Sequence, residues 1–333
     1  MSLPPIDIPL GAIRFNSDSQ KLEYWMGSAW MQIKTFSPDL DGGTRGLNSG
    51  FFNSPTATNE IDYITIDTQG NAIDFGDLTT TTRDGGALAS RTRYCHTGGN
   101  RNGSNSVTID FVTIASTGDA QDFGDLTSHL YQGTSCGNQT RGIIYQDAGT
   151  PSGTHSLDFI AIAQTGNAVE FGDIYSNNGA RQNPGSLASP TRMIIGGGGA
   201  PNVLSGMDFI TIPTQGNSQD FGDLAVASRS QSGIHNATRG IFTGGGPPSN
   251  VNIMEFIQIA TGGNAINYGD LTASDGGGRM ASMSSGTRGV LTTSSNVLSM
   301  CSIVTAGDTV DFGDAVNSRS TERGSSNGHG GLG

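Results

Sequence analysis

The sequence predicts an all-β protein built from short strands and turns. Of its 333 residues, 51 are Gly and only 34% are apolar, a balance that suits many short strands better than long helices. Such a composition is also typical of disordered chains, so a periodic pattern is needed to support a folded protein. The chain has that pattern, because one phrase returns along most of its length and each copy has the alternation of a β-strand.

The repeated phrase is NAIDFGDLT at 71–79, and it has five further copies. These are DAQDFGDLT (119–127), NAVEFGDIY (167–175), NSQDFGDLA (217–225), NAINYGDLT (264–272) and DTVDFGDAV (308–316). A second phrase, IDYITI in its first copy, precedes each of them, and Thr-Arg-Gly or a close variant lies further upstream. The repeats, called units 1 to 6, are 44–91, 92–139, 140–190, 191–237, 238–286 and 287–333.

Each unit reads as four short strands. IDFVTI (109–114) alternates apolar with polar or small residues, and Gly followed by Asn or Asp then predicts a tight turn into the DFGDL strand. RGIFTGGG (239–246) is an example of the strand that precedes this hairpin. RSQSGIHNA (229–237) is an example of the weaker strand that follows the hairpin at the end of a unit. Four strands repeated six times predict a six-bladed β-propeller of four-stranded blades, with a solenoid as the alternative.

Spacing distinguishes two faces of this propeller. The two aromatic positions of the hairpin are 12 residues apart in every unit, whereas the other connections vary in length. Because alternate turns of a meander lie on opposite faces, we expect one uniform face and one variable face, and the variable face is the place for recognition. The candidate contact residues there are Asn100, Arg101, Asn102, Asn177, Asn178, Pro248, Ser249 and Asn250.

The C-terminal segment 319–333 matches the end of one unit and the beginning of another, while unit 1 lacks the strand that should precede it. We therefore expect this segment to complete the first blade and close the ring, which removes open sheet edges. Its deletion should lower the thermal midpoint.

A family resemblance covers roughly 44–333. The order Arg229, Gly244-Gly245, Phe256, Tyr268 and Leu271 resembles a degenerate kelch repeat, with Phe or Tyr where that family usually has Trp. The resemblance implies a kelch-like six-bladed propeller and transfers no catalytic residue. The phrase TGNA-x-DFGDL after FITI also resembles repeats in structural and tail-fibre proteins of marine bacteriophages.

Residues 1–40 do not repeat and form a separate attachment segment and linker, before the propeller at 41–333. Segments 12–16, 21–25 and 30–33 read as a three-stranded β-meander that is too small to bury much surface alone. We expect it to pack through Trp25 and Trp30 on a partner or on copies of itself. The segment 11–33 resembles the IRFN…LEYYNGSAW segments of phage tail fibres.

Two polar positions recur in every unit, and we interpret both as structural, because a catalytic site needs a few residues in one asymmetric place. The carboxylates are expected to accept turn amide bonds or to pair with the repeated Arg. The acidic positions are Asp77, Asp125, Asp173, Asp223, Asp270 and Asp314. The basic positions are Arg45, Arg93, Arg141, Arg192, Arg239 and Arg288.

Other chemistry has little support. The net charge of −12 argues against a nucleic-acid partner. The acidic doublets lack a calcium-loop pattern, so we expect no metal and no cofactor. We expect the three cysteines to be buried free thiols, and most of the five histidines to lie at the surface or in turns. We expect neither a membrane-spanning segment nor a signal peptide.

Together, these features predict a non-enzymatic phage virion protein of the tail fibre or baseplate, made in the host cytoplasm. Its N-terminal meander would attach to other virion proteins, and its propeller would bind a host-surface receptor, for example a glycan. One alternative is a purely structural connector or decoration protein. Another is a propeller glycan hydrolase, because acidic residues are abundant.

Overall fold

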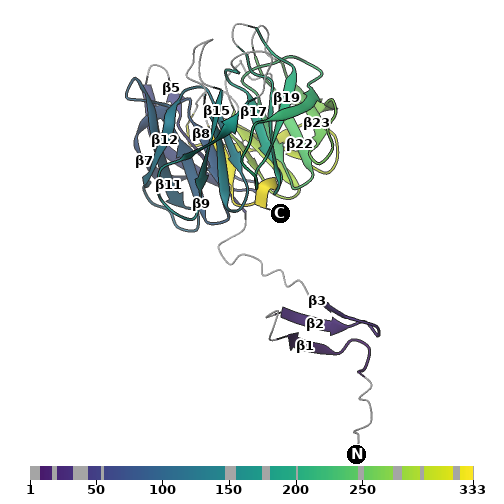
Figure 1. The fold of residues 1–333 in the computed structure, drawn as a ribbon. Coiled ribbons are helices and arrows are strands. Elements are labelled where there is room, and N and C mark those ends of the chain that lie inside the picture. The colour runs from purple at the N-terminus through teal and green to yellow at the C-terminus, as the bar shows by residue number, and fades with distance from the viewer. Residues whose placement is uncertain are drawn as a thin grey trace, which may run out of the picture. The chain divides into compact units, whose positions relative to one another are not determined.

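The structure, a computed structural model, describes residues 8–16, 21–32, 44–53, 56–146, 155–174, 181–199, 202–246, 251–272, 280–292, 296–317 and 323–332. The chain divides into two compact parts, here called the N-terminal sheet (residues 1–41) and the repeat body (residues 42–333). Within the described residues, the regular structure consists of β-strands and one short 3₁₀ turn, η1 (Gly330–Leu332). The predicted all-β fold is therefore confirmed (Figure 1).

The N-terminal sheet is the predicted three-stranded meander. Its strands β1 (Ile13–Asn16), β2 (Lys21–Trp25) and β3 (Trp30–Gln32) pair antiparallel in that order. The rings of Trp25 and Trp30 lie 5.4 Å apart, and the guanidinium of Arg14 lies 4.2 Å from the centre of the Trp30 ring. The indoles are thus packed within the sheet and half-buried rather than fully exposed.

The repeat body contains four separate antiparallel four-stranded sheets. In order, their strands are β13 (Thr134–Gly137), β14 (Arg141–Tyr145), β15 (Ser156–Ala161), β16 (Val169–Asp173); β17 (Gly185–Ala188), β18 (Arg192–Gly196), β19 (Gly206–Thr211), β20 (Gln219–Asp223); β21 (Ser232–His235), β22 (Arg239–Thr243), β23 (Ile253–Gln258), β24 (Ile266–Asp270); and β25 (Ser282–Ser284), β26 (Arg288–Thr292), β27 (Val297–Ser302), β28 (Val310–Asp314).

A ten-stranded sheet joins the remaining strands. Its order is β29 (Arg323–Ser326), β4 (Arg45–Ser49), β6 (Thr56–Thr65), β7 (Ile73–Arg83), β10 (Asn100–Arg101), β11 (Ser104–Thr113), β9 (Arg93–Thr97) and β8 (Gly86–Ala89), with β12 (Gln121–Leu130) paired to β11 and β5 (Phe52–Asn53) to β6. It holds two further runs of four strands, β29-β4-β6-β7 and β8-β9-β11-β12, which the short strand β10 bridges.

The sheets are arranged like the blades of a propeller. The first strand of each run contacts the first strands of its neighbours, in the closed order β8, β13, β17, β21, β25, β29 and back to β8. Each run takes its first strand from the end of one repeat unit and its other three strands from the next unit. For the first run that strand is β29, which pairs antiparallel with β4, with Ser326 opposite Gly46. The expected pairing of the C-terminal segment with unit 1 is thus confirmed.

The hydrophobic core lies between neighbouring sheets. The second strands, such as β14 with the sequence RGIIY, are buried on both faces after their Arg, which explains their unbroken apolar runs. One core cluster combines Ile143 and Leu157 of one sheet with Met193 and Ile210 of the next. Burial between sheets therefore fixes the order of the units around the repeat body.

The meander topology places the constant and variable connections on opposite faces, as the spacing predicts. Turns between the third and fourth strands lie on the uniform face, whereas connections between the second and third strands lie on the variable face. β4 begins at Arg45 on the uniform face, so the chain enters the repeat body there. η1 lies on that same face (Figure 1).

Candidate functional site

The repeated turn holds each unit to the unit before it. The amide of Gly118 donates to the carbonyl oxygen of Phe75 at 2.8 Å, and the amide of Ala120 donates to that of Asp77 at 2.7 Å. A side-chain oxygen of Asp119 then accepts the amide of Asp77 at 3.1 Å. The equivalent side-chain bond occurs at all six junctions, at 2.9 to 3.1 Å. It includes the bond from Asp314 of unit 6 to Asn71 of unit 1.

The repeated Asp therefore contributes its backbone amide to the junction, and its carboxylate is exposed in every unit. Among the described residues, the ion pairs are Arg14–Glu23, Arg83–Asp84, Arg101–Asp110 and Arg181–Asp208. The predicted pairing of the repeated Asp with the repeated Arg is thus wrong. The carboxylate of the repeated Asp faces solvent, and the guanidinium of the repeated Arg bonds to the backbone of the next unit.

The repeated Arg clamps two units together. A guanidinium nitrogen of Arg141 donates to the carbonyl oxygens of Ile212 at 3.1 Å and Pro213 at 2.9 Å. The same guanidinium lies 5.3 Å from the centre of the Phe159 ring. All six repeated Arg residues donate to a carbonyl of the next unit, at 2.8 to 3.4 Å. The repeated Arg therefore links each unit to the next, and its structural role remains the interpretation that its recurrence suggested.

Replacement of Arg141 by Lys should lower the free energy of unfolding by about 1 kcal/mol, because an ammonium cannot both bridge two carbonyls and stack flat on Phe159. Urea denaturation measures the effect. The control is Arg14→Lys, since Arg14 belongs to the N-terminal sheet and not to the repeat body. An unchanged repeat-body transition in Arg141→Lys would contradict the clamp.

A buried acid recurs beside the first aromatic, and the sequence analysis did not single it out. Five units have a carboxylate there and unit 6 has Ser, and all six residues are at most 3% exposed. They are Asp62, Asp110, Asp158, Asp208, Glu255 and Ser299. The sequence does contain a signal for this buried acid, because the acid in IDF, LDF and MDF occupies a strand position whose side chain faces the core.

These buried carboxylates bind the end of the preceding sheet. Asp110 accepts the hydroxyl of Thr79 at 2.8 Å, and Asp158 accepts that of Thr127 at 2.7 Å. Burial raises the pKa of Asp158, and hydrogen bonds from Thr127 oppose this rise. Burial likewise raises the pKa of Asp208 to about 6, opposed by Arg181. Asp110, Asp158, Asp208 and Glu255 thus accept hydrogen bonds from the preceding unit and are further inter-unit links.

The variable-face candidates divide into different environments. Arg101 is 8% exposed, and its guanidinium forms an ion pair with Asp110 at 2.9 Å, so its side chain is part of the interior. Asn100 is half-buried in β10, while Asn102 is exposed in the following turn with a φ of 49°. The remaining candidates, Asn177, Asn178, Pro248, Ser249 and Asn250, lie outside the described residues.

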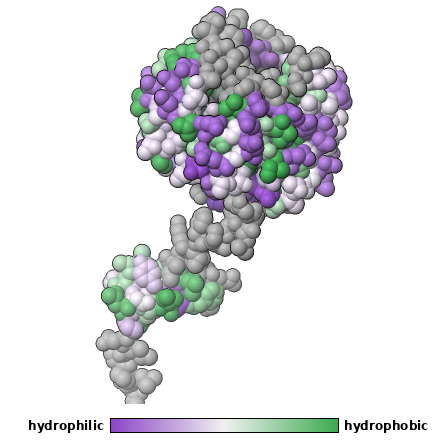
Figure 2. Space-filling model, turned by 180° about the vertical axis from the view of Figure 1, so that it is seen from behind, coloured by the Kyte–Doolittle hydropathy of each residue, from purple (hydrophilic) through white to green (hydrophobic). Residues whose placement is uncertain are grey.

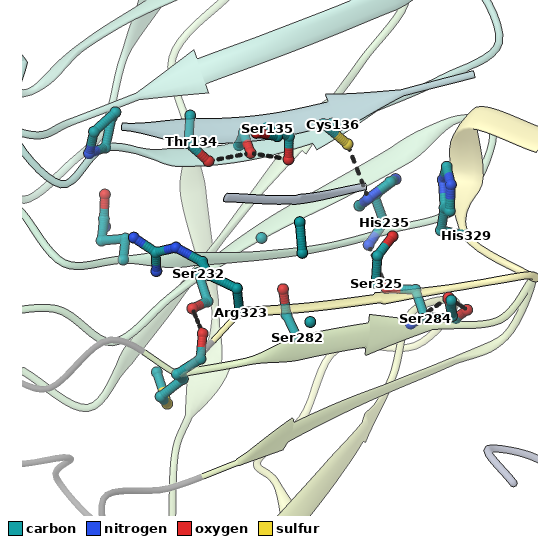
Figure 3. A pocket seen from close by; sticks show the side chains of 18 residues that line it. Thr134, Ser135, Cys136, Ser232, His235, Ser282, Ser284, Arg323, Ser325 and His329 are labelled. Carbon is teal, nitrogen blue, oxygen red and sulfur yellow. Dashed lines mark hydrogen bonds between the residues drawn. The ribbon is translucent and has the colours of Figure 1, made fainter. Parts of the chain in front are cut away.

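The first strands of the sheets enclose a narrow polar channel (Figure 3). Beside it, the hydroxyls of Thr134 and Ser186 join two neighbouring first strands at 2.6 Å, and Thr97 of the second strand β9 pairs with Ser135 at 2.7 Å. The cavity inside is about 40 Å³, which accommodates a few water molecules. It is far smaller than the several hundred Å³ of a typical small-molecule site, so the channel is a seam between strands rather than a ligand pocket.

Three of the five histidines are buried, contrary to the expectation that most lie at the surface or in turns. His96, His235 and His329 are at most 6% exposed. The His235 and His329 rings lie 5.3 Å apart, and each has a ring nitrogen within 2.8 Å of a backbone carbonyl oxygen. Burial lowers the pKa of His235 to about 3 and that of His329 to about 4. Both rings are therefore neutral at pH 7.

This burial makes the repeat body sensitive to acid. A His whose pKa is lower in the folded state contributes stability that is intact above pH 6.5 and is lost as pH falls. Between pH 7.5 and pH 5, the free energy of unfolding of the wild type should fall by about 2 kcal/mol more than that of His235→Gln. This figure corresponds to the roughly 1.5 pH units between 6.5 and 5, at about 1.4 kcal/mol each. Urea denaturation at pH 7.5 and pH 5 measures this difference, with exposed His129→Gln as the control. A difference that does not change with pH would contradict neutral burial.

The three cysteines are free and buried, as expected. Among the described residues there is no group of three or more His, Cys, Asp or Glu side chains placed to hold a metal ion. In the same part of the chain, no helix has the length and apolar character needed to cross a membrane.

Apolar side chains are unusually exposed on the N-terminal sheet (Figure 2). Leu10 is 78% exposed, Ile13 66% and Phe15 64%, although the sheet has only three short strands.

The chain matches no protein-family model and none of the curated proteins.

Proposed function

We propose that the repeat body is a six-bladed, kelch-like β-propeller. The support is the recurrence of the same junction at all six places, including the bond from Asp314 to Asn71 that links the last unit to the first. The order of Arg, Gly pair, first aromatic and second aromatic in units such as 238–286 supports the kelch type. The Gly pair is clear only in some units, Thr292-Thr293 stands in its place in the last, and Met300 replaces the first aromatic of unit 6.

We propose that the chain is a structural protein of a phage virion, in the tail fibre or baseplate, without enzymatic activity. The observation that carries this proposal is that the recurring polar residues are used to join units, while the central channel is too narrow for a ligand. What varies between units is the connections on one face, which suits recognition of a host-surface receptor, including a glycan.

The N-terminal sheet is the proposed attachment to other virion proteins. Its exposed Leu10, Ile13 and Phe15 need a partner or further copies of the chain to cover them. Since the chain enters the repeat body on the uniform face, the variable face is the end opposite the entry point. This polarity suits a protein that is anchored at one end and presents loops at the other. The resemblance of 11–33 to phage tail-fibre segments supports the same assignment.

Three experiments test the proposal. Mass spectrometry and immunogold microscopy of purified particles should find the chain on the tail, and its absence from particles would overturn a virion role. Fluorescently labelled full-length protein should bind host cells saturably and compete with infection. A chain found in particles that binds no cells would instead support the purely structural connector. Release of reducing sugar from host polysaccharide would favour the glycan hydrolase.

A further inference from the structure

Unit 6 departs from the repeat at the first aromatic position. Units 1 to 5 have an aromatic residue beside the buried acid, and unit 6 has Met300. In the five aromatic units, the repeated Arg lies over this ring at 4.6 to 5.3 Å. The same ring packs against the second aromatic of its hairpin, with centroids 5.8 to 6.4 Å apart. Each ring is therefore held between a guanidinium and another ring.

Arg288 of unit 6 keeps its backbone contacts without such a ring. It donates to the carbonyl oxygens of Ile66 at 3.4 Å and Asp67 at 2.9 Å, so its guanidinium is fixed as in the other units. Phe312, the second aromatic, is buried in its usual place. Unit 6 thus has the guanidinium and the second aromatic ring, and Met300 occupies the position of the first aromatic ring.

Unit 6 has a larger pocket at the place where unit 2 has a smaller one. In unit 2 the pocket is about 160 Å³ and is lined by the 111–121 hairpin, including Phe111, Thr117 and Gln121. In unit 6 it is about 410 Å³, and every one of these lining positions has its counterpart. The counterparts of the three named residues are Met300, Ala306 and Val310, so the larger pocket is also the more apolar one.

The pocket opens to solvent, and its lining includes one carboxylate, Asp308, whose Oδ1 accepts the backbone amide of Asp270 at 2.9 Å. Val310 at its edge is 51% exposed. Cys301 lines the base as a buried thiol whose pKa burial raises to about 12, so it is neutral. Gln69 of unit 1 donates to the carbonyl oxygen of Asp311 at 3.0 Å, and its amide nitrogen lies 3.9 Å from the Met300 sulfur. The Met side chain is flexible and can move aside for a planar group.

We propose that this pocket binds one aromatic side chain of a partner polypeptide, with its ring stacked on Arg288. The occupant is identified by the five other units, where an amino-acid ring, Phe or Tyr, fills the equivalent place between Arg and the second aromatic. The pocket supplies the remaining contacts: a cation–π face from Arg288 and apolar walls from Met300 and Val310. The inference goes beyond the proposed function and does not depend on it.

Methyl NMR of the full-length protein tests this site. With ¹³C-methyl methionine, the Met300 resonance, assigned from its loss in Met300→Leu, should shift upfield by ring current on titration with N-acetyl-tyrosinamide or N-acetyl-tryptophanamide. The dissociation constant should be on the order of 1 mM, as expected for ligands of this size. N-acetyl-leucinamide should bind at least tenfold more weakly. Equal binding of leucinamide, or no shift with either aromatic amide, overturns the proposal.

Two variants complete the test. Met300→Phe restores the repeat and should abolish binding, as measured by ligand-observed NMR. The thermal midpoint of this variant should be unchanged or higher. Phe111→Met should open the equivalent site under Arg93 and add a second methionine resonance that shifts with the same probes. Retained binding in Met300→Phe overturns the site, as does failure of Phe111→Met to gain one. Binding of free phenol without the capped amino acids overturns the assignment to a polypeptide.

Discussion

Removal of residues 323–333 lowers the thermal midpoint of the repeat body by roughly 10 °C. The segment provides β29, whose four residues pair with β4, and β29 also contacts β8 and β25. Four strand residues at about 1 kcal/mol each, together with the contacts beyond them, represent about 5 kcal/mol. At about 2 °C per kcal/mol for a body of this size, the midpoint falls by about 10 °C. Differential scanning calorimetry measures it.

Graded truncation separates the strand from the segment that follows it. Residues 327–332 close the channel on the uniform face: His329 bonds to the Ala89 carbonyl oxygen at 2.8 Å, and Arg91 donates to that of Leu332 at 3.4 Å. A Cβ on Gly331 would lie 1.9 Å from the Gly137 oxygen, so the backbone fits there without side chains. A chain ending at 326 should lose part of the stability, and a chain ending at 322 should lose more.

The matched control removes residues 1–43 instead, which takes away the N-terminal sheet and leaves the repeat body complete. Its midpoint should be unchanged, because the hydrophobic clusters of the described residues all lie in the repeat body. If the chain ending at 322 melted like the wild type, closure by β29 would contribute nothing and the energetic interpretation of this pairing would be wrong.

The sequence predicted the features that depend on residues close together in the chain. The constant 12-residue spacing, with Gly-Asn or Gly-Asp between the strands, determines turn length and register within one hairpin. The three strands of the N-terminal sheet and the pairing of the C-terminal segment with unit 1 followed from local alternation and from a strand missing in unit 1. Each of these features depends on local strand propensity and on the number of residues between recurring positions.

The sequence did not predict the contacts between units. The repeated Asp was expected to act through its carboxylate, whereas its amide bonds to the neighbouring turn and the buried acid beside the aromatic carries the charge-assisted bonds. Asp158 and Thr127, for example, are 31 residues apart, and only the stacking of sheets brings them together. His235 and His329 are also distant in the chain, and their burial results from the convergence of the inner strands.

The candidate site was predicted only in part for the same reason. Recurrence predicted a structural role for the repeated Arg, and the first aromatic positions contained a further signal. Met300 departs from that set, and its meaning depends on Arg288 and Phe312, which lie beside it in the fold. Arg101 shows the opposite case, because a polar residue in a variable connection was taken as a contact and is instead buried against Asp110.

Replacement of Gly172 by Ala is the second change with a large expected effect, a loss of about 3–5 kcal/mol in the free energy of unfolding. Gly172 has a φ of +154°, and a Cβ there would lie 2.5 Å from the carbonyl oxygen of Gly216. That atom belongs to the turn whose amides bond to the Phe171 and Asp173 carbonyls. Strained φ costs about 1–3 kcal/mol, and the clash displaces a backbone junction that cannot rotate away.

Two other glycines separate the causes. Gly166 has the same φ of +154° but no heavy atom within 4 Å of an added Cβ, and Gly286 likewise has open space, with no positive φ. Urea denaturation should therefore rank the loss as Gly172→Ala, then Gly166→Ala, then Gly286→Ala with almost none. Equal losses at Gly172 and Gly166 would mean that conformation alone requires glycine in the DFGD phrase. A larger loss at Gly172 means that the close approach of the neighbouring unit requires it, which ties the most repeated residue of the sequence to the junction rather than to the strand.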